Sequence, residues 1–384
     1  MTRRPRGRRR WLGALAAALL LAVAGALLWR GVGRSPLGGP AAGPVTPAAS
    51  PTGSGTLPPG ATTPPGGAHL KPAMVGLIDR QGFPADDYRP VVSGVVVDAT
   101  WDELQPAPGA TIVAGNPIDA AITEVRALNR AQPDHQMALK LRVFAGIHAP
   151  EWAKELGGSP VSVTDPVDNV TGTIGRFWTD EYGRAYADLE AQLAARYDGV
   201  PEIREVTIAR CTTVYDEPFI RDRQDPATVQ ALLDAGFTVS ADVQCLREQV
   251  DAHDVWQTTR SGLALNPYQR IDATQGRAED EPITDAMMGY CRQRLGARCV
   301  LENDSLRSPP LAGAYTAMYQ RMEAFGAPIS IQTATPRKVG DLAATVQIAV
   351  ALGASAVELP RGDGGLTPTQ LEPLSRALLA VPFG

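Results

Sequence analysis

The chain has 384 residues, with 36 Lys and Arg against 41 Asp and Glu and a formal net charge of -5. This acidic balance argues against a nucleic-acid partner, because nucleic-acid-binding domains carry a basic excess. The basic residues are also unevenly placed, since residues 1–10 hold six arginines and no acidic residue. We read this segment as a cytoplasmic tail, because arginines ahead of an apolar segment keep the N-terminus inside the cell.

Residues 11–30 begin with the apolar run "WLGALAAALLLAVAGALL". About 18 such residues are enough to cross a bilayer, so we predict a single-pass anchor in the cell membrane with the C-terminal domain extracellular. The alternative is a cleaved signal sequence, with "AVAGA" as the cleavage site and a secreted product. Residues 31–70 consist almost entirely of Pro, Gly, Ala, Ser and Thr, a composition typical of a solvated linker. Residues 71–384 are left as one folded domain.

Four cysteines, all in the folded part, indicate two disulfides in an exported domain. Proximity in sequence favours the pairs Cys291–Cys299 and Cys211–Cys245, and four buried thiols are the alternative. The chain has no CxxC spacing and four histidines, none in a ligand-like cluster. We therefore expect no metal site and no cofactor.

Short apolar runs rich in β-branched residues recur from residue 74 onward, separated by helical patterns such as 180–197 and 339–354. Near-continuous apolar strands are typical of a parallel sheet covered on both faces. Eight strands alternating with helices predict a (β/α)8 TIM barrel, with a degraded or absent helix after the first strand. A doubly wound open sheet is the alternative, but the expected Gly-rich phosphate loop is missing. The eight runs are 74–79, 92–99, 138–146, 205–211, 262–267, 298–303, 328–334 and 355–360.

The carboxyl ends of barrel strands carry function, so the polar and aromatic residues there are the candidates. Carboxylates, amides and tryptophans on one rim are typical of a sugar site, which makes carbohydrate the expected partner. The candidate substrate-binding residues are Asp98, Trp101, Arg142, His148, Trp152, Tyr215, Asp216, Asn266, Gln332 and Glu358. Alternatives apply to several of them: Trp101 and Trp152 suit barrel-mouth packing, His148 suits a backbone hydrogen bond, and Glu358 suits an ion pair with Arg361.

Glu217 in "YDEPF" is the candidate acid catalyst, because a short step from the fourth strand places it at the rim. Pro218 restricts Glu217 to an extended backbone. The alternative is that the two acids cap the next helix, since carboxylates suit a helix N-terminus. Glycoside hydrolysis needs a second carboxyl, and Glu302 at the end of an apolar strand is our candidate.

Four stretches together resemble the retaining clan-A glycoside hydrolases, in the manner of family 42 β-galactosidase-like barrels. They are "WDELQPAPG" (101–109), "LRVFAGIHAPEWAK" (141–154), the helix at 177–203 and "YDEPF" (215–219). The resemblance implies an acid/base Glu at the end of strand 4, which Glu217 matches, although the family's Asn before it is here Asp216. It implies a nucleophilic Glu at the end of strand 7, where our strand count gives Gln332.

Three outcomes follow from Gln332. The strand count is off and Glu302 is the nucleophile, Glu358 takes that role, or the barrel binds glycan without cleaving it. We therefore predict an exported glycoside hydrolase with Glu217 and Glu302 as catalytic residues, and a catalytically inactive glycan-binding barrel is the alternative. A lyase or aldolase barrel would require a strand-end lysine, whereas Lys140 lies inside the third predicted strand.

Overall fold

The computed structural model describes residues 69–273 and 276–382, which belong to one compact unit, Pro64–Gly384. The expected tail, membrane segment and linker lie outside the described residues, apart from the last two positions of the linker. Within the described ranges, no helix is both long and apolar enough to span a membrane.

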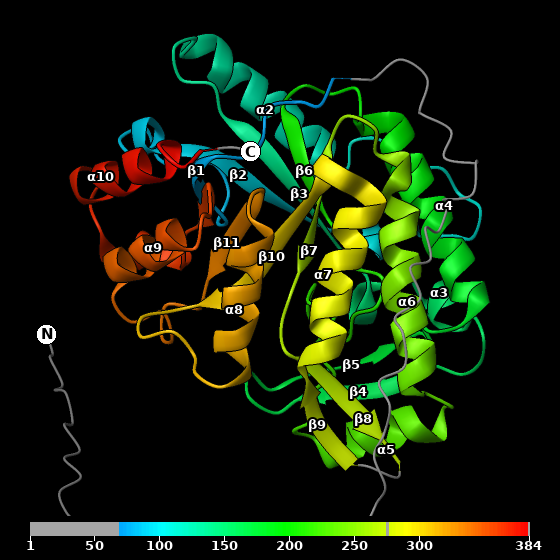
Figure 1. The fold of residues 1–384 in the computed structure, drawn as a ribbon. Coiled ribbons are helices and arrows are strands. Elements are labelled where there is room, and N and C mark those ends of the chain that lie inside the picture. Colours follow the sequence, from blue (N-terminus) through cyan, green and yellow to red (C-terminus); the bar gives the residue numbers. More distant parts are fainter. Residues whose placement is uncertain (1–68, 274–275, 383–384) are drawn as a thin grey trace, which may run out of the picture. The chain divides into compact units, whose positions relative to one another are not determined.

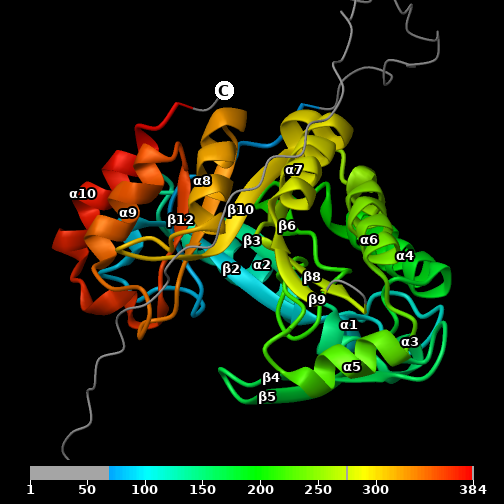
Figure 2. The ribbon, with the colours of Figure 1, turned by 60° about the horizontal axis from the view of Figure 1, so that its bottom comes forward.

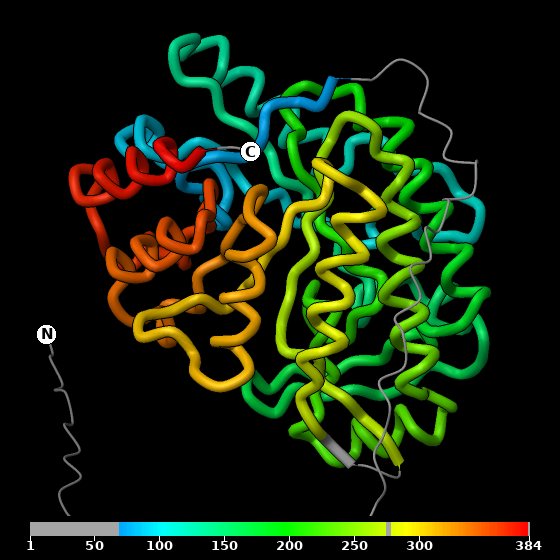
Figure 3. The backbone as a smooth tube through the Cα atoms, viewed as in Figure 1, coloured from blue at the N-terminus to red at the C-terminus, as the bar shows by residue number. Residues whose placement is uncertain are grey.

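Eight parallel strands form a closed barrel in the order β1-β12-β11-β10-β7-β6-β3-β2 (Figure 1). All eight predicted runs are barrel strands, so the predicted (β/α)8 barrel is confirmed. β1 pairs with β12 and closes the barrel, and α10, near the end of the chain, packs beside β1 (Figure 3). The barrel strands are β1 (Gly76–Asp79), β2 (Val92–Thr100), β3 (Ala138–Phe144), β6 (Ile203–Thr207), β7 (Arg260–Ala264), β10 (Cys299–Leu306), β11 (Ile329–Thr333) and β12 (Ala356–Glu358).

Helices cover the outside of the barrel, and the connection between β1 and β2 contains just a 3-10 turn at Arg89–Val91, as its length predicts. The predicted helix at 180–197 is α4, which buries Tyr182, Tyr186, Leu189, Leu193 and Tyr197 along one face. The helices are α1 (Trp101–Leu104), α2 (Pro117–Ala131), α3 (Glu151–Lys154), α4 (Asp180–Tyr197), α5 (Pro226–Asp234), α6 (Val239–Ala252), α7 (Glu281–Leu295), α8 (Ala314–Phe325), α9 (Leu342–Ala351) and α10 (Pro368–Leu379).

Two antiparallel hairpins extend the connections that follow barrel strands. β4 (Val161–Asp165) and β5 (Val170–Ile174) lie between β3 and α4, and β8 (Tyr268–Asp272) and β9 (Gly276–Asp280) lie between β7 and α7. α5 packs along β4 (Figure 2), where the Thr164 amide donates a hydrogen bond to the Thr228 hydroxyl (2.8 Å). Because both hairpins follow the carboxyl ends of strands, they build up the rim on which a barrel carries its site.

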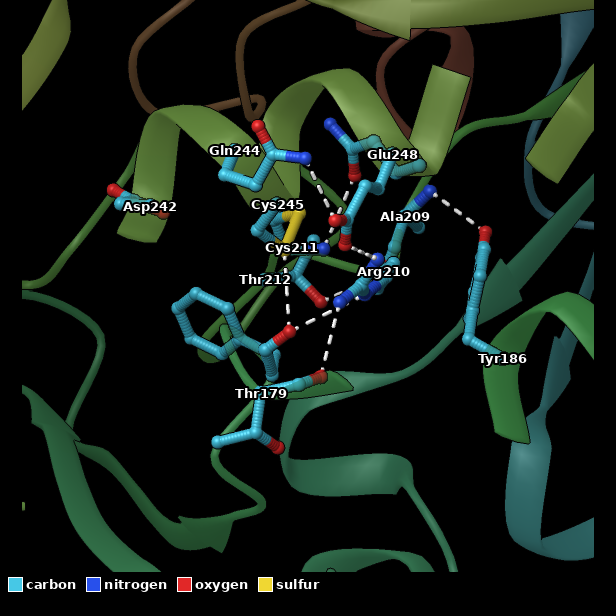
Figure 4. Close-up of a disulfide and its surroundings, with 12 residues drawn as sticks. Thr179, Tyr186, Ala209, Arg210, Cys211, Thr212, Asp242, Gln244, Cys245 and Glu248 are labelled. Carbon is cyan, nitrogen blue, oxygen red and sulfur yellow. Dashed lines mark hydrogen bonds and ion pairs between the residues drawn. A yellow bond between two sulfur atoms is a disulfide. The ribbon is translucent and has the colours of Figure 1, made fainter. Parts of the chain in front are cut away.

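Both predicted disulfides, Cys211–Cys245 and Cys291–Cys299, are present. Cys211 lies just after β6, and its bond to Cys245 ties the chain there to α6 (Figure 4). Beside it, the buried Arg210 side chain pairs with Glu248 (2.8 Å) and donates to the Thr179 carbonyl (3.2 Å). These contacts fix the segment that leads to Glu217.

Candidate active site

The barrel interior holds a buried ion cluster centred on Lys140 of β3. The Lys140 ammonium lies 2.8 Å from a carboxylate oxygen of Glu302, 2.8 Å from one of Glu358 and 3.1 Å from one of Glu205. The four side chains are at most 2% exposed. They meet because alternate residues of a strand point inward, from β3, β6, β10 and β12. Gly262 of β7 leaves the room for Glu302, since a Cβ there would overlap the Glu302 carboxylate.

A second cation, Arg142, lies two residues further along β3 and faces the same interior. Its guanidinium contacts Glu358 (2.6 Å) and Asp216 (2.7 Å), and Asp98 lies 3.7 Å away. Glu358 thus touches both Lys140 and Arg142. These two cations outweigh the effect of burial and lower the pKa of Glu358 to about 2. Glu358 is therefore a fixed anion of the cluster.

Glu302 has a different balance of charges. Burial raises its pKa well above the usual range, and although Lys140 opposes this, the Glu205 carboxylate adds to it. Two cations face more than two carboxyls in the interior, so a proton on Glu302 relieves the excess negative charge. Lys140 itself keeps its proton, because its three carboxylates overcome burial and raise its pKa well above normal. That protonation removes the free amine that a Schiff base requires.

A polar pocket of about 310 Å³ lies above this cluster. Glu217, Asn266, Asp304 and Gln332 line it, and Glu302 and Glu358 are not among its lining residues. The segment after β6, the ends of β10 and β11 and the β7–β8 connection supply these four side chains. The pocket therefore lies on the rim of strand carboxyl ends, where barrel enzymes carry their sites.

Glu217 is held in this pocket by Asn266, whose side-chain amide donates to Glu217 Oε1 (2.8 Å). The Asn266 carbonyl oxygen in turn accepts a hydrogen bond from the Tyr315 hydroxyl (3.0 Å), which fixes the orientation of the amide. Burial and the nearby Asp216 charge raise the pKa of Glu217 to about 7, against the opposing hydrogen bond from Asn266 and the charge of Arg142. Glu217 thus titrates near neutral pH, where a group can both give and accept a proton.

Asp304 is another carboxyl that lines the pocket. It is 7% exposed, and neither of its carboxylate oxygens has a hydrogen-bond partner within the described residues. Burial, the charge of Asp216 and the charge of Glu217 raise its pKa well above the usual range, although Arg142 opposes them. A buried polar group without a partner requires an explanation, and a pocket that binds a ligand supplies one.

An acidic group borders the pocket on the side of β3 and β6. The Tyr215 hydroxyl donates to Asp165 Oδ2 (2.8 Å) and lies 3.2 Å from Asp168 Oδ2. Asp222 is close by on the pocket wall, and burial raises its pKa to about 6. These oxygens can accept hydrogen bonds from the hydroxyl groups of a ligand.

Four of the predicted site residues lie away from this pocket. Trp101 is fully buried and packs edge-on against Trp152, Tyr182 and Tyr186. The Trp101 ring therefore has no exposed face on which a sugar could stack, and it packs within the barrel mouth as the alternative interpretation predicts. Trp152 and Asp98 line two other hollows, with Asp98 beside Arg80 and Arg361. The His148 ring packs against Phe144.

Of the remaining predicted residues, the structure brings Tyr215, Glu217, Asn266 and Gln332 together in the pocket. It places Arg142, Asp216, Glu302 and Glu358 in the buried ion network beneath. Our prediction missed Asp304 and Tyr315. Period-two alternation gives a signal for Asp304, because it faces the same side as Glu302 and lies nearer the carboxyl end of the strand. Tyr315 comes from the start of α8 and carries no such signal.

No protein-family model and no curated protein matches the chain. Solved structures that resemble it include three glycosidases. Endo-glycoceramidase II from Rhodococcus sp. has 15% identity and a TM-score of 0.44, with 80% of each chain covered. The Pseudomonas stutzeri endoglucanase has 10% identity and a TM-score of 0.42, with 76% of this chain and 83% of that one covered. The β-galactosidase from the psychrophilic Marinomonas ef1 has 12% identity and a TM-score of 0.41, over 74% and 53%.

The first test concerns the ion cluster. We expect Lys140→Met to lower the free energy of unfolding at pH 7 by about 3–5 kcal/mol, because three buried carboxyls lose their shared cation. Urea unfolding followed by circular dichroism measures this change. The matched control is Lys338→Met, whose ion pair with Asp168 is exposed on both sides and whose loss we expect to cost under about 1 kcal/mol. Equal losses in the two variants would contradict the role assigned to Lys140.

Proposed function

We propose that the chain is a glycoside hydrolase that cleaves O-glycosidic bonds with two carboxyl groups, Glu217 and Asp304. The observation that carries the proposal is Glu217: a carboxyl on the strand rim of the barrel, held by Asn266 and with a pKa of about 7. A group with these properties suits the exchange of a proton with a glycosidic oxygen at neutral pH. In this proposal Glu217 is the general acid/base.

The second carboxyl in our proposal is Asp304 in place of Glu302. Glu302 is bound to Lys140 below the pocket, whereas Asp304 lines the pocket with Glu217 and has two unpartnered oxygens. The charge of Glu217 raises the pKa of Asp304, so in our proposal the two carboxyls share one proton. A pair with one proton has both the acid and the carboxylate that glycoside hydrolysis needs.

A glycan-binding barrel without catalysis is the second candidate. One observation in its favour is that Glu358 forms ion pairs with two cations, Lys140 and Arg142. The other is that the seventh barrel strand, β11, contributes Gln332 and not a Glu to the pocket. Under this alternative Asp304 and Glu217 would accept hydrogen bonds from sugar hydroxyls. The two candidates differ in one measurement, the release of product.

The catalytic proposal is tested with paired variants and two leaving groups. We expect Glu217→Gln to lower kcat by about 10²–10⁴-fold on 4-nitrophenyl glycosides and much less on 2,4-dinitrophenyl glycosides, which need little protonation. Asp304→Asn should lower kcat on both, because the second carboxyl acts on the sugar carbon whatever the leaving group is. The matched control is Glu372→Gln on the exposed face of α10, which should retain full activity.

The reverse leaving-group pattern would contradict the roles given to the two carboxyls. If the unaltered chain releases no product from a broad panel of aryl glycosides and oligosaccharides, hydrolysis is contradicted and the binding alternative remains.

The pH profile provides an independent test. Because an acid catalyst must be protonated, kcat/KM should fall as pH rises above the Glu217 pKa of about 7. The Asp216 charge raises the pKa of both Glu217 and Asp304, so Asp216→Asn should move both limbs of the profile to lower pH. Arg142, freed from Asp216, acts in the same direction on both groups. A profile that stays in place or moves to higher pH would contradict the coupling.

We also propose that the domain is exported and tethered by residues 11–30. The two disulfides support this, since they form in oxidising compartments. Mass spectrometry of protein from cells lysed in excess alkylating reagent should detect no modified cysteine until a reductant is added. Alkylation of all four cysteines without reductant would contradict export.

A further inference from the structure

The cations that border the pocket lie on one side of it. Arg80 follows β1, Arg307 follows β10 and Lys338 lies between β11 and α9. These strands belong to one continuous run of the barrel, β1-β12-β11-β10. The acidic group around Tyr215 comes from the segments after β3 and β6, which lie across the barrel from β11 and β12. The pocket therefore has a cationic side, which also carries the carboxyl of Asp304 from β10, and an acidic side around Tyr215 that supplies none of these three cations.

The three cationic side chains make few hydrogen bonds to the rest of the protein. Arg80 Nε is buried without a hydrogen-bond partner within the described residues, and its Nη2 reaches the Ala334 carbonyl at 3.5 Å. Arg307 donates to the Ser305 carbonyl of its own segment (3.1 Å). Lys338 lies 3.8 Å from Asp168 across the pocket, with 40% of its side chain exposed.

Arg80 is the cation of the three whose buried guanidinium nitrogen lacks a hydrogen-bond partner within the described residues. Burial lowers the pKa of Arg80, which means that its charge is poorly solvated. Glu358 and Asp304 exert an opposing, favourable effect, but Glu358 is already in contact with Lys140 and Arg142. An added oxyanion would supply the paired hydrogen bonds that the planar guanidinium is shaped to make.

We propose that the pocket takes an anionic saccharide, with its oxyanion held on the cationic side by Arg80 and Arg307 and its hydroxyls on the acidic side. The oxyanion is a uronate carboxylate or a sulfate ester, which share this chemistry. The inference rests on the proposed function, since it names the substrate class of the same site. Lys338, more exposed, adds charge to the entrance of the cationic side.

The experiment measures binding in the absence of turnover. Full-length protein carrying Glu217→Gln is titrated calorimetrically with galacturonate and glucuronate disaccharides, the matched galactose and glucose disaccharides, and their 6-sulfated forms. We expect at least one anionic probe to bind about ten- to a hundredfold more tightly than its neutral match, the range for charge-assisted hydrogen bonds. The uronate and sulfate arms identify which oxyanion the site prefers.

Further substitutions, made in the Glu217→Gln protein, test which cations cause the preference for anionic probes. Arg80→Gln or Arg307→Gln should abolish the preference for the anionic probe and leave the affinity for its neutral match unchanged. The unchanged neutral affinity also shows that each variant is folded. The matched control is Arg184→Gln on α4, which removes an exposed arginine outside the pocket and should keep the preference.

The inference is overturned if the neutral probes bind as tightly as the anionic ones, if no anionic probe binds, or if the preference survives both Arg80→Gln and Arg307→Gln. Its failure is distinct from failure of the proposed function. Hydrolysis of neutral glycosides without a charge preference would overturn the inference alone. Selective binding of anionic probes, with no product released by the unaltered chain, would support the inference and contradict hydrolysis.

Discussion

The contact of Lys140 with three buried carboxyl groups is the constraint on which the rest of the site depends. Barrel interiors are usually filled by branched apolar side chains, whereas this one carries charges at its centre. Burying an ion is costly unless it is paired, so each carboxyl must lie close to a cation, and the cation must lie between them. One strand, β3, supplies both Lys140 and Arg142, and β6, β10 and β12 supply the carboxyls Glu205, Glu302 and Glu358. The register of the barrel is therefore tied to its electrostatics.

The same constraint decides which carboxyls are available for chemistry. Glu358 ends β12 and Glu302 lies within β10, and both are held by the cations below the pocket. Glu217 and Asp304 lie nearer the carboxyl ends of the strands than the ion cluster does, and the Asp304 carboxylate has no hydrogen-bond partner among the described residues. Asp216 connects the two levels, because it pairs with Arg142 and its charge raises the pKa of both pocket carboxyls. A buried network thus sets the proton affinity of the rim.

How far the sequence predicts this arrangement depends on the range of the interactions involved. Strand positions and the α4 face follow from local periodicity, and the rim position of Glu217 follows from its distance to a strand end. The partner of Glu302 does not, because Lys140 is 162 residues away and their contact depends on how strands pair around the barrel. Trp101 differs from its predicted role in sugar binding for a related reason. The local sequence predicts that it follows β2, whereas its burial depends on contacts with α4 and Trp152, which are distant in sequence.

The division of the pocket into a cationic and an acidic side follows from the order of the strands. Segments that are distant in sequence, such as those holding Arg80 and Arg307, are brought near one another because β1 and β10 are separated by two strands in the closed barrel. The acidic side is built mainly by the β4–β5 hairpin, an addition to the third connection. In our proposal these connections determine the ligand preference, whereas Lys140 and its three carboxyls all lie on the barrel strands themselves. The segment after β6 takes part in both, because it carries Tyr215 of the acidic side and Asp216, which pairs with Arg142.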